Sequence, residues 1–436
     1  MNINHIVVQD TCKHDNAGVI KLKRLTMKFL LCKRRYTTVI LPLIMALNMA
    51  PGEAEAQIRI TKPAGEKTSI DLAGMTVSSD PASREFQRTL QNNLSRSGWF
   101  TIGRPGASEV RVMGSVQQRR GALVVECRVL AAASGRSFMS QSYDRSAEEA
   151  RRLAHRVADD IVEAVTGHKG IASTRIVMVG TPTGHKELYI SDADGGNIIQ
   201  LTNDEAISVR PRWSPDGKQI VYTGYLQRFP DIFRIDLPTG RREVVANFPG
   251  LNTAAAISPD GRDVALILSK DGNPELYIRN LRSGRLTRLT NTPNAAEASP
   301  SWSPDGRRIV YVSDQTGRPQ LYIISRDGGR PERLTSRGRV NVAPDWGPNG
   351  LITYSSFIDG TYHVCVIDPE TREVRQISSG ATDWDDPSWA PNGRHIVCSR
   401  RQNNRYTLYV LDTMGDPPVR LINESGDWYS PAWSPD

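Results

Sequence analysis

The chain has 436 residues, of which 39% are hydrophobic, 23% are charged and 7% are aromatic. This composition is typical of a folded protein with sizeable cores, and it excludes a largely disordered chain. The formal net charge is +8, but residues 1–56 contribute half of it, because they hold eight Lys and Arg against four Asp and Glu. The remaining charge is too small to indicate nucleic-acid binding.

Residues 1–56 are predicted to be a leader that contains a secretory signal peptide. A basic cluster at 33–35 precedes an apolar run at 39–47, and small residues follow up to Ala56. This order predicts export, with cleavage between Ala56 and Gln57. The apolar run falls short of the roughly 20 residues that a membrane span needs, so we expect no span in the mature chain. Met27 is an alternative start of translation.

Residues 57–167 are predicted to form a small α/β domain. Asp80 and Pro81 start a helix that ends at Gly98, and Ser146 with Glu149 forms a capping box for a second helix that ends at Gly167. Strands are expected between the helices, at 99–102, 110–117, 123–131 and 137–143. A short linker, 168–174, follows this domain.

Three cysteines follow the predicted cleavage site: Cys127, Cys365 and Cys398. An odd number without a close pair argues against a disulfide framework, even in an exported protein. We therefore expect buried free thiols that pack as small hydrophobic side chains.

A tetrapeptide turn recurs six times in the last three fifths of the chain. Its Pro is followed by Asp or Asn and, except at the C-terminus, by Gly, which suits a tight turn between two strands. Successive prolines lie 43 to 45 residues apart, the period of a four-stranded propeller blade. A Trp directly precedes five of the turns, and Ile257 takes its place in the second. The prolines are Pro215, Pro259, Pro304, Pro348, Pro391 and Pro435, and the tryptophans are Trp213, Trp302, Trp346, Trp389 and Trp433.

The two ends of the repeat array complement each other. The first copy starts near Arg175 and lacks a first strand, whereas the segment 429–433 is a first strand with nothing after it. We predict an all-β propeller of six blades over 175–436, closed by pairing of the C-terminal strand with the N-terminal blade.

One Trp per blade, fixed before a tight turn, is the pattern expected of packing between blades. We therefore assign these five tryptophans to the core. By contrast, Trp384 and Trp428 are predicted to lie in loops and to contact a partner.

The loops that enter the first strand of each blade are expected to surround the mouth of the central channel. These loops are 203–210, 248–254, 291–299, 337–343, 380–386 and 424–430. Their acidic residues outnumber their basic ones, which predicts a mouth that receives a partner with a basic surface. The alternative is that loops are polar in any case and that this sign arises by chance. The acidic residues are Asp204, Glu205, Glu297, Asp383, Asp385, Asp386, Glu424 and Asp427, and the basic ones are Arg210, Arg337 and Arg339.

The exported leader, the second helix running into Gly167, and the Trp-Ser-Pro-Asp-Gly blades together resemble the TolB family of periplasmic propellers, over essentially all of 57–436. The resemblance implies a scaffold of the Tol-Pal system in Gram-negative bacteria that supports outer-membrane integrity and constriction at division. It implies binding of TolA by the mature N-terminal segment, Gln57, Ile58, Arg59, Ile60 and Thr61. It also implies that the protein binds the lipoprotein Pal, with other envelope proteins as further candidate partners. The resemblance further implies a monomer that works within a complex. The candidate Pal contacts are Arg210, Leu251, Asn252, Ala254, Glu297, Ala298, Asn341, Trp384, Asp385, Asp386, Trp428 and Tyr429.

Catalytic, metal and cofactor sites are not expected. Similar blades precede the catalytic domain of prolyl oligopeptidase-type peptidases, but the sequence has no Gly-x-Ser-x-Gly nucleophile elbow. Its histidines show no metal-ligand spacing. Asp192 and Asp194 faintly resemble a calcium loop, although a hairpin turn is favoured there. A propeller receptor for a carbohydrate or another small ligand, or a peptidase-type propeller without its catalytic domain, remains the alternative.

Overall fold

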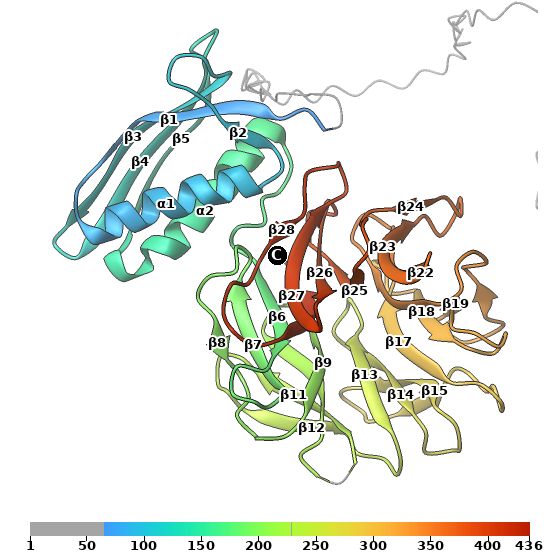
Figure 1. The fold of residues 1–436 in the computed structure, drawn as a ribbon. Helices are drawn as coiled ribbons and strands as arrows, with labels where there is room; N and C mark the ends of the chain where they lie inside the picture. Colours follow the sequence, from blue (N-terminus) through green and yellow to red (C-terminus); the bar gives the residue numbers. More distant parts are fainter. Residues whose placement is uncertain (1–64, 228) are drawn as a thin grey trace, which may run out of the picture. The chain divides into compact units, whose positions relative to one another are not determined.

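The computed structural model describes residues 65–227 and 229–436. The predicted leader, its cleavage site and the segment from Gln57 to Thr61 lie outside the described residues. An α/β domain comes first, and a ring of six four-stranded sheets follows (Figure 1). The predicted fold class, a six-bladed propeller preceded by a small α/β domain, is confirmed.

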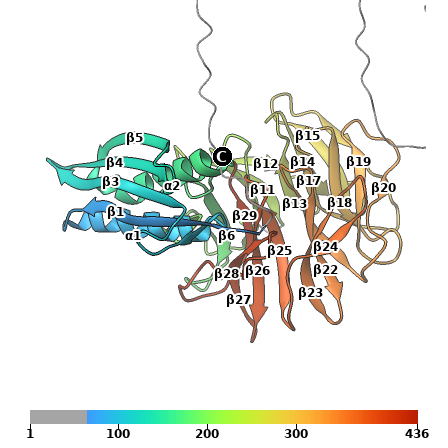
Figure 2. The same cartoon turned by 90° about the horizontal axis from the view of Figure 1, so that it is seen from above.

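The α/β domain is a five-stranded sheet with order β2-β1-β3-β4-β5. Two helices cover one face of this sheet, and Figure 2 shows the sheet and helices as two layers. Phe86 and Leu90 of the first helix and Val157 and Ile161 of the second are fully or almost fully buried against it. The elements are β1 (Thr68–Val77), α1 (Pro81–Arg96), β2 (Phe100–Ile102), β3 (Val110–Arg119), β4 (Ala122–Ala131), β5 (Ser137–Ser146), the 3-10 turn η1 (Ala147–Glu149) and α2 (Ala150–Thr166).

The helix starts show one correct prediction and one wrong one. Asp80 caps α1, since its Oδ1 accepts a hydrogen bond from the Ser83 N–H at 2.8 Å. The capping box predicted for the second helix is wrong. Strand β5 pairs with β4 as far as Ser146, so the chain needs the turn η1 before it can become helical. Ser146 Oγ accepts from the Glu148 N–H at 3.4 Å, and α2 begins at Ala150 without a side-chain cap.

Each propeller blade is an antiparallel meander of four strands, and the inner strands β9, β13, β17 and β25 lie nearest the ring's centre in Figure 1. The first blade contains β9 (Ser208–Trp213), β10 (Gln219–Gly224), β11 (Asp231–Asp236) and β12 (Arg242–Ala246). The second contains β13 (Asn252–Ile257), β14 (Asp263–Leu268), β15 (Glu275–Asn280) and β16 (Leu286–Arg288). The third contains β17 (Glu297–Trp302), β18 (Arg308–Ser313), β19 (Gln320–Ser325) and β20 (Glu332–Arg333).

The remaining blades include the one that joins the two ends of the array. The fourth contains β21 (Asn341–Trp346), β22 (Ile352–Ile358), β23 (Thr361–Ile367) and β24 (Val374–Gln376). The fifth contains β25 (Asp383–Trp389), β26 (His395–Gln402), β27 (Arg405–Asp412) and β28 (Val419–Arg420). The sixth contains β29 (Trp428–Trp433), β6 (Arg175–Gly180), β7 (Glu187–Asp192) and β8 (Ile199–Gln200). In this last blade Trp433 pairs with Ile176, so the C-terminal strand completes a sheet that begins some 250 residues earlier.

The repeated tryptophans pack between neighbouring blades, as predicted. All five are between 5% and 8% exposed. The indole N–H of Trp213 donates to the Ala432 carbonyl, and that of Trp302 donates to the Ala256 carbonyl, each at 2.9 Å. The three cysteines after the leader are free and buried, also as predicted.

Candidate partner-binding face

The loops that enter the inner strands lie at one end of the ring, which we call the mouth. Because the strands of each blade alternate in direction, the loops between second and third strands reach the same end. A partner at the mouth would therefore meet two loops from every blade.

Each inner strand carries a β-bulge near its start, where one residue adopts the left-handed conformation. Such a conformation costs a residue other than glycine roughly 1–3 kcal/mol, so its recurrence in all six blades indicates a built-in feature. A small cavity of about 30 Å³ on the channel is lined by all six of these residues. They are Arg210, Ala254, Ser299, Ala343, Asp386 and Ser430, with φ between 46° and 55°.

This ring of bulge residues carries charges of both signs. Arg210 Nη1 donates to Ser299 Oγ at 3.1 Å, and Ser430 Oγ donates to Asp386 Oδ2 at 2.6 Å. Burial, followed by the neighbouring Asp386 carboxylate, raises the pKa of Asp385 to about 6. Asp385 is therefore ionised at neutral pH and becomes protonated in mildly acidic solution.

The prediction that Trp384 and Trp428 lie in loops is wrong. Both belong to inner strands, and each is 2% exposed. Trp384 packs edge-on against Tyr409 at 5.3 Å between ring centroids, and Trp428 packs against Tyr189 at 5.1 Å. The strands extend further toward the mouth than the turn residues around them suggest, so these rings fill the core of their blades.

Asn252, Glu297 and Asn341 occupy the corresponding position at the start of three other inner strands and are also buried. Their side chains join neighbouring blades. Asn252 Nδ2 donates to the Pro230 carbonyl of the preceding blade at 3.2 Å. Asn341 Nδ2 donates to Gln320 Oε1 at 2.9 Å. These three buried side chains therefore connect neighbouring blades and are not available to contact a partner.

The remaining predicted contact residues are more accessible to solvent, except Ala254. Arg210 is exposed, and Ala254 is 8% exposed. The half-buried ones are Leu251, Ala298, Asp385, Asp386 and Tyr429. The structure thus brings Arg210, Ala254 and Asp386 together on the channel and leaves the others around it.

The acidic character of the mouth is weaker than the sequence count suggests. Asp204 is ion-paired with Arg242 at 2.9 Å, and Asp427 lies 3.8 Å from Arg405. Burial raises the pKa of Glu297 to about 7, so this carboxyl is partly neutral at physiological pH. Of the acids in these loops, Glu205 and Glu424 are exposed.

The opposite end of the channel opens into a cavity of about 420 Å³. The repeated Trp and Pro of the tetrapeptide turns line it, and so do Arg212 and Asp345. Burial raises the pKa of Asp345, although its carboxylate accepts the Trp389 N–H at 2.8 Å. Arg212 and Asp345 have no repeated sequence signal, because each occurs in one blade and breaks the repeat.

Comparison with known proteins decides the family. The family described as TolB beta propeller domain matches residues 162–436. The Tol-Pal system protein TolB of Gluconobacter oxydans is 32% identical over 415 residues, which cover 88% of this chain and 90% of that protein.

The chain belongs to the TolB family.

Two further comparisons agree with this assignment. The protein TolB homolog of Chlorobaculum tepidum is 36% identical over 165 residues, or 38% of each chain. The crystal structure of TolB from Acinetobacter baumannii has a TM-score of 0.78 at 28% identity, and the match covers 85% of this chain and 97% of that one. In the described part of this TolB-family chain, no helix combines the length and hydrophobicity that crossing a membrane would require.

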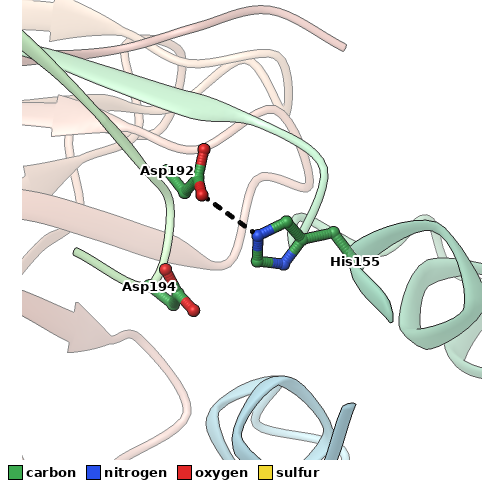
Figure 3. Close-up of side chains that lie close together, drawn as sticks. All are labelled: His155, Asp192 and Asp194. Carbon is green, nitrogen blue, oxygen red and sulfur yellow. Dashed lines mark hydrogen bonds and ion pairs between the residues drawn. The ribbon is translucent and has the colours of Figure 1, made fainter. Parts of the chain in front are cut away.

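A cluster of charged side chains lies where the α/β domain of this TolB-family protein meets the propeller. His155 of α2 points toward Asp192 of β7, with Asp194 beside it (Figure 3). Arg151 donates to both carboxylates, to Asp192 at 2.8 Å. Hydrogen bonds from His155 and Arg151 outweigh the effect of burial and lower the pKa of Asp192.

The arrangement could offer one nitrogen and two carboxylate oxygens to a metal ion, but its hydrogen bonds favour a structural role. His155 Nδ1 accepts from the Asn93 amide at 2.8 Å, so its Nε2 carries the proton that faces Asp192 at 3.3 Å. The Arg151 guanidinium supplies the positive charge that a metal would bring. The turn expected from the sequence is present, since the Gly195 N–H donates to the Asp192 carbonyl at 2.9 Å.

A cavity of about 360 Å³ lies beside this cluster, between the two domains. Apolar side chains from both domains line it, including Val162, Ile171, Val410 and Trp433. Its volume is within the range of small-ligand pockets. No local sequence pattern indicates this cavity, because its wall combines residues from distant parts of the chain.

Proposed function

We propose that this protein is a non-catalytic interaction scaffold of the Tol-Pal system in the periplasm of a Gram-negative bacterium. It links the lipoprotein Pal to the Tol proteins, and through them it supports outer-membrane integrity and constriction at division. Membership of the TolB family and a relative named as a Tol-Pal system protein support this proposal.

The mouth of the propeller is the proposed binding face for Pal. The observation that carries this assignment is the open ring of left-handed bulge residues, with Arg210 and Asp386 facing the channel and two loops per blade around it. Rigid elements that present several loops at one end are well suited to bind a folded partner. A basic partner surface would be attracted by the half-buried Asp385 and Asp386 and by the exposed Glu205 and Glu424.

The mature N-terminal segment, Gln57 to Thr61, is the proposed TolA-binding element. This part of the proposal rests on the family resemblance, because the segment lies outside the described residues. Deleting 57–61 should abolish binding of the TolA periplasmic domain and leave binding at the mouth intact.

Calorimetric titration of the chain from Gln57 with the periplasmic domain of Pal from the same organism tests the proposal. We expect saturable one-to-one binding that the double variant Asp385→Asn/Asp386→Asn weakens. A double variant on the opposite end of the ring, Asp327→Asn/Glu370→Gln, removes two exposed carboxylates and should bind like the wild type. A folded wild-type chain that gives no heat at two temperatures would refute the proposed Pal interaction.

An exported receptor for a small ligand is the second candidate function, and the apolar cavity of about 360 Å³ between the domains favours it. This alternative predicts a higher melting temperature in the presence of a ligand from a glycan or metabolite library. The scaffold predicts no such shift.

A further inference from the structure

We propose that the mouth contains an apolar contact site on the first and second blades, and that this site docks an apolar patch of the partner that binds there. We call it the apolar sector. It consists of Ile207, Tyr225, Leu226, Phe229, Phe248 and Leu251. The inference rests on the proposed function, because it assigns this surface to the same partner.

The first blade exposes four large apolar side chains in two adjoining loops. Ile207 is 41% exposed, Tyr225 38%, Leu226 36% and Phe229 60%. The Tyr225 N–H donates to the Ile207 carbonyl at 2.8 Å, so the loop that enters β9 lies directly against the loop between β10 and β11. Contiguous exposed apolar side chains of this size commonly mark protein interaction sites.

The second blade extends the same surface. Phe248 and Leu251 are half-buried in the loop that enters β13, and Phe248 also packs against the hydrophobic core between the first and second blades. Asn252 joins this loop to the first blade, since its Nδ2 donates to the Phe248 carbonyl at 2.7 Å and to the Pro230 carbonyl at 3.2 Å. The Arg279 guanidinium lies 5.7 Å from the Phe248 ring centroid. The sector is therefore held in place before a partner arrives, which lowers the entropy cost of binding.

Charge is distributed unevenly around the mouth. The segment 248–254 contains no charged residue, and 203–210 carries charges of both signs, whereas all charged residues of 380–386 and 424–430, which lead into the fifth and sixth blades, are acidic: Asp383, Asp385, Asp386, Glu424 and Asp427. The apolar sector is also continuous with the bulge ring, because Ala254 of β13 stands three residues after Leu251 and Arg210 of β9 stands three residues after Ile207. A fitting partner is thus a folded protein whose binding face places an apolar patch beside a basic one.

Binding of the Pal periplasmic domain to the double variant Leu226→Ser/Phe229→Ser tests this inference. We expect at least a tenfold higher Kd than for the wild type, mainly through faster dissociation, as is typical of an apolar hot spot. Both side chains are exposed, so the melting temperature should stay the same. The control is Val374→Ser on the outer strand β24. Val374 is 43% exposed, and its replacement should not affect binding.

The outcomes separate the two proposals. If the wild type binds Pal and the double variant binds within twofold of it, the apolar sector is refuted and the proposed function stands. If the wild type does not bind Pal, the proposed function fails and the inference falls with it. If sedimentation shows a wild-type dimer that the double variant dissociates while Pal binding is unchanged, the sector joins two copies of this chain and the inference is wrong.

Hydrogen exchange in the wild-type complex provides a second readout that does not depend on a variant. Backbone amides of Tyr225, Leu226 and Leu251 should exchange more slowly when Pal is bound. Unchanged exchange at all three would overturn the assignment, even if Pal binds elsewhere on the propeller.

Discussion

The guanidinium of Arg394 lies 4.4 Å from the ring centroid of Trp99, so a side chain of the fifth blade packs on the α/β domain. The same guanidinium donates to the Gly98 carbonyl at 2.9 Å and to Asp412 at 2.6 Å. Arg394 is 6% exposed and Asp412 is 7% exposed. One buried ion pair thus connects the propeller to the end of helix α1, next to the linker.

Replacing Arg394 should loosen this connection. In Arg394→Met the Asp412 carboxylate stays buried without its main partner, and the loss of stability should be about 3–5 kcal/mol. We expect a lower thermal midpoint and faster proteolysis in the linker 168–174. The double variant Arg394→Met/Asp412→Asn should recover part of the loss, because no unpaired charge remains.

Arg308 provides a matched control for that experiment. It lies 5.0 Å from the Trp346 ring centroid and is ion-paired with Glu370, but this contact is within the propeller and largely exposed. Arg308→Ala should cost less than about 1 kcal/mol. An Arg394→Met variant as stable and as protease-resistant as Arg308→Ala would show that Arg394 does not anchor the α/β domain.

A second prediction concerns pH and the pair Glu275 and Glu297 between the second and third blades. Thr292 Oγ1 contacts both carboxyls, at 3.3 Å and 2.8 Å. Burial raises the pKa of Glu297 to about 7, and the negative charge of Glu275 acts in the same direction. Hydrogen bonds from Thr290 and Thr292 and the ion pair with Arg288 lower the pKa of Glu275 against the effect of burial.

The sign of the pH effect follows from the raised pKa of Glu297. The folded state keeps a proton on Glu297 that the unfolded state loses near pH 4.5, so stability should fall as the pH rises from about 4.5 to about 7. Glu297→Gln keeps the shape without the ionisation. The free energy of unfolding of this variant, relative to that of the wild type, should rise by on the order of 2 kcal/mol from pH 5 to pH 8. Thermal midpoints across this range provide the measurement.

Glu424→Gln, which removes an exposed carboxylate, is the control and should follow the wild type at each pH. At the next blade interface the corresponding residues are Gln320 and Asn341, hydrogen-bonded at 2.9 Å without an ionisable group. If Glu297→Gln and wild type keep a constant difference from pH 5 to pH 8, Glu297 does not hold the extra proton.

The sequence predicted the ring because its signals are local and repeated. A Pro-Asp-Gly or Pro-Asn-Gly turn and the Trp before it specify the same geometry at each blade, and five tryptophans at this position are buried as expected. The bulges also have a sequence signal of their own. A Pro stands two residues before the Trp in five blades, and Pro cannot donate to a regular ladder. These prolines are Pro211, Pro300, Pro344, Pro387 and Pro431.

The candidate site was predicted less well, because burial at the mouth depends on contacts between blades. Trp384 and Glu297 follow turn-like residues, and sequence alone does not reveal that neighbouring blades cover them. Strand β1 was missed for a similar reason. Its residues Thr68 to Val77 include Gly74 and show no clean alternation of buried and exposed positions, yet β1 is an interior strand that lies between β2 and β3 and runs parallel to both. The interdomain cavity has no local signal at all.

The buried position of Trp428 leads to a third prediction. Trp428→Ala should remove a ring that contacts Tyr189 and also the indole donor to the Glu424 carbonyl at 3.3 Å. A core Trp replaced by Ala costs about 3–5 kcal/mol, so the thermal midpoint should fall markedly. Tyr225→Ala, at an exposed aromatic residue of the apolar sector, should leave the midpoint nearly unchanged. A Trp428→Ala variant that melts like the wild type but loses Pal binding would restore the contact role first predicted for Trp428.

The last prediction joins the electrostatics of the mouth to the proposed partner. Burial and the adjacent Asp386 raise the pKa of Asp385 to about 6, while Ser355 and Arg210 act in the opposite direction. Asp385 should therefore lose its charge as the pH falls through about 6, and attraction of a basic partner should weaken with it. Stopped-flow association with the Pal domain at low salt should be slower at pH 5 than at pH 7.5. Asp385→Asn should already be slow at pH 7.5 and should respond less to pH than the wild type. The partner's own titration is common to both chains, so the difference between them reports on Asp385. Equal pH dependence of the two association rates would show that this carboxylate does not steer the partner.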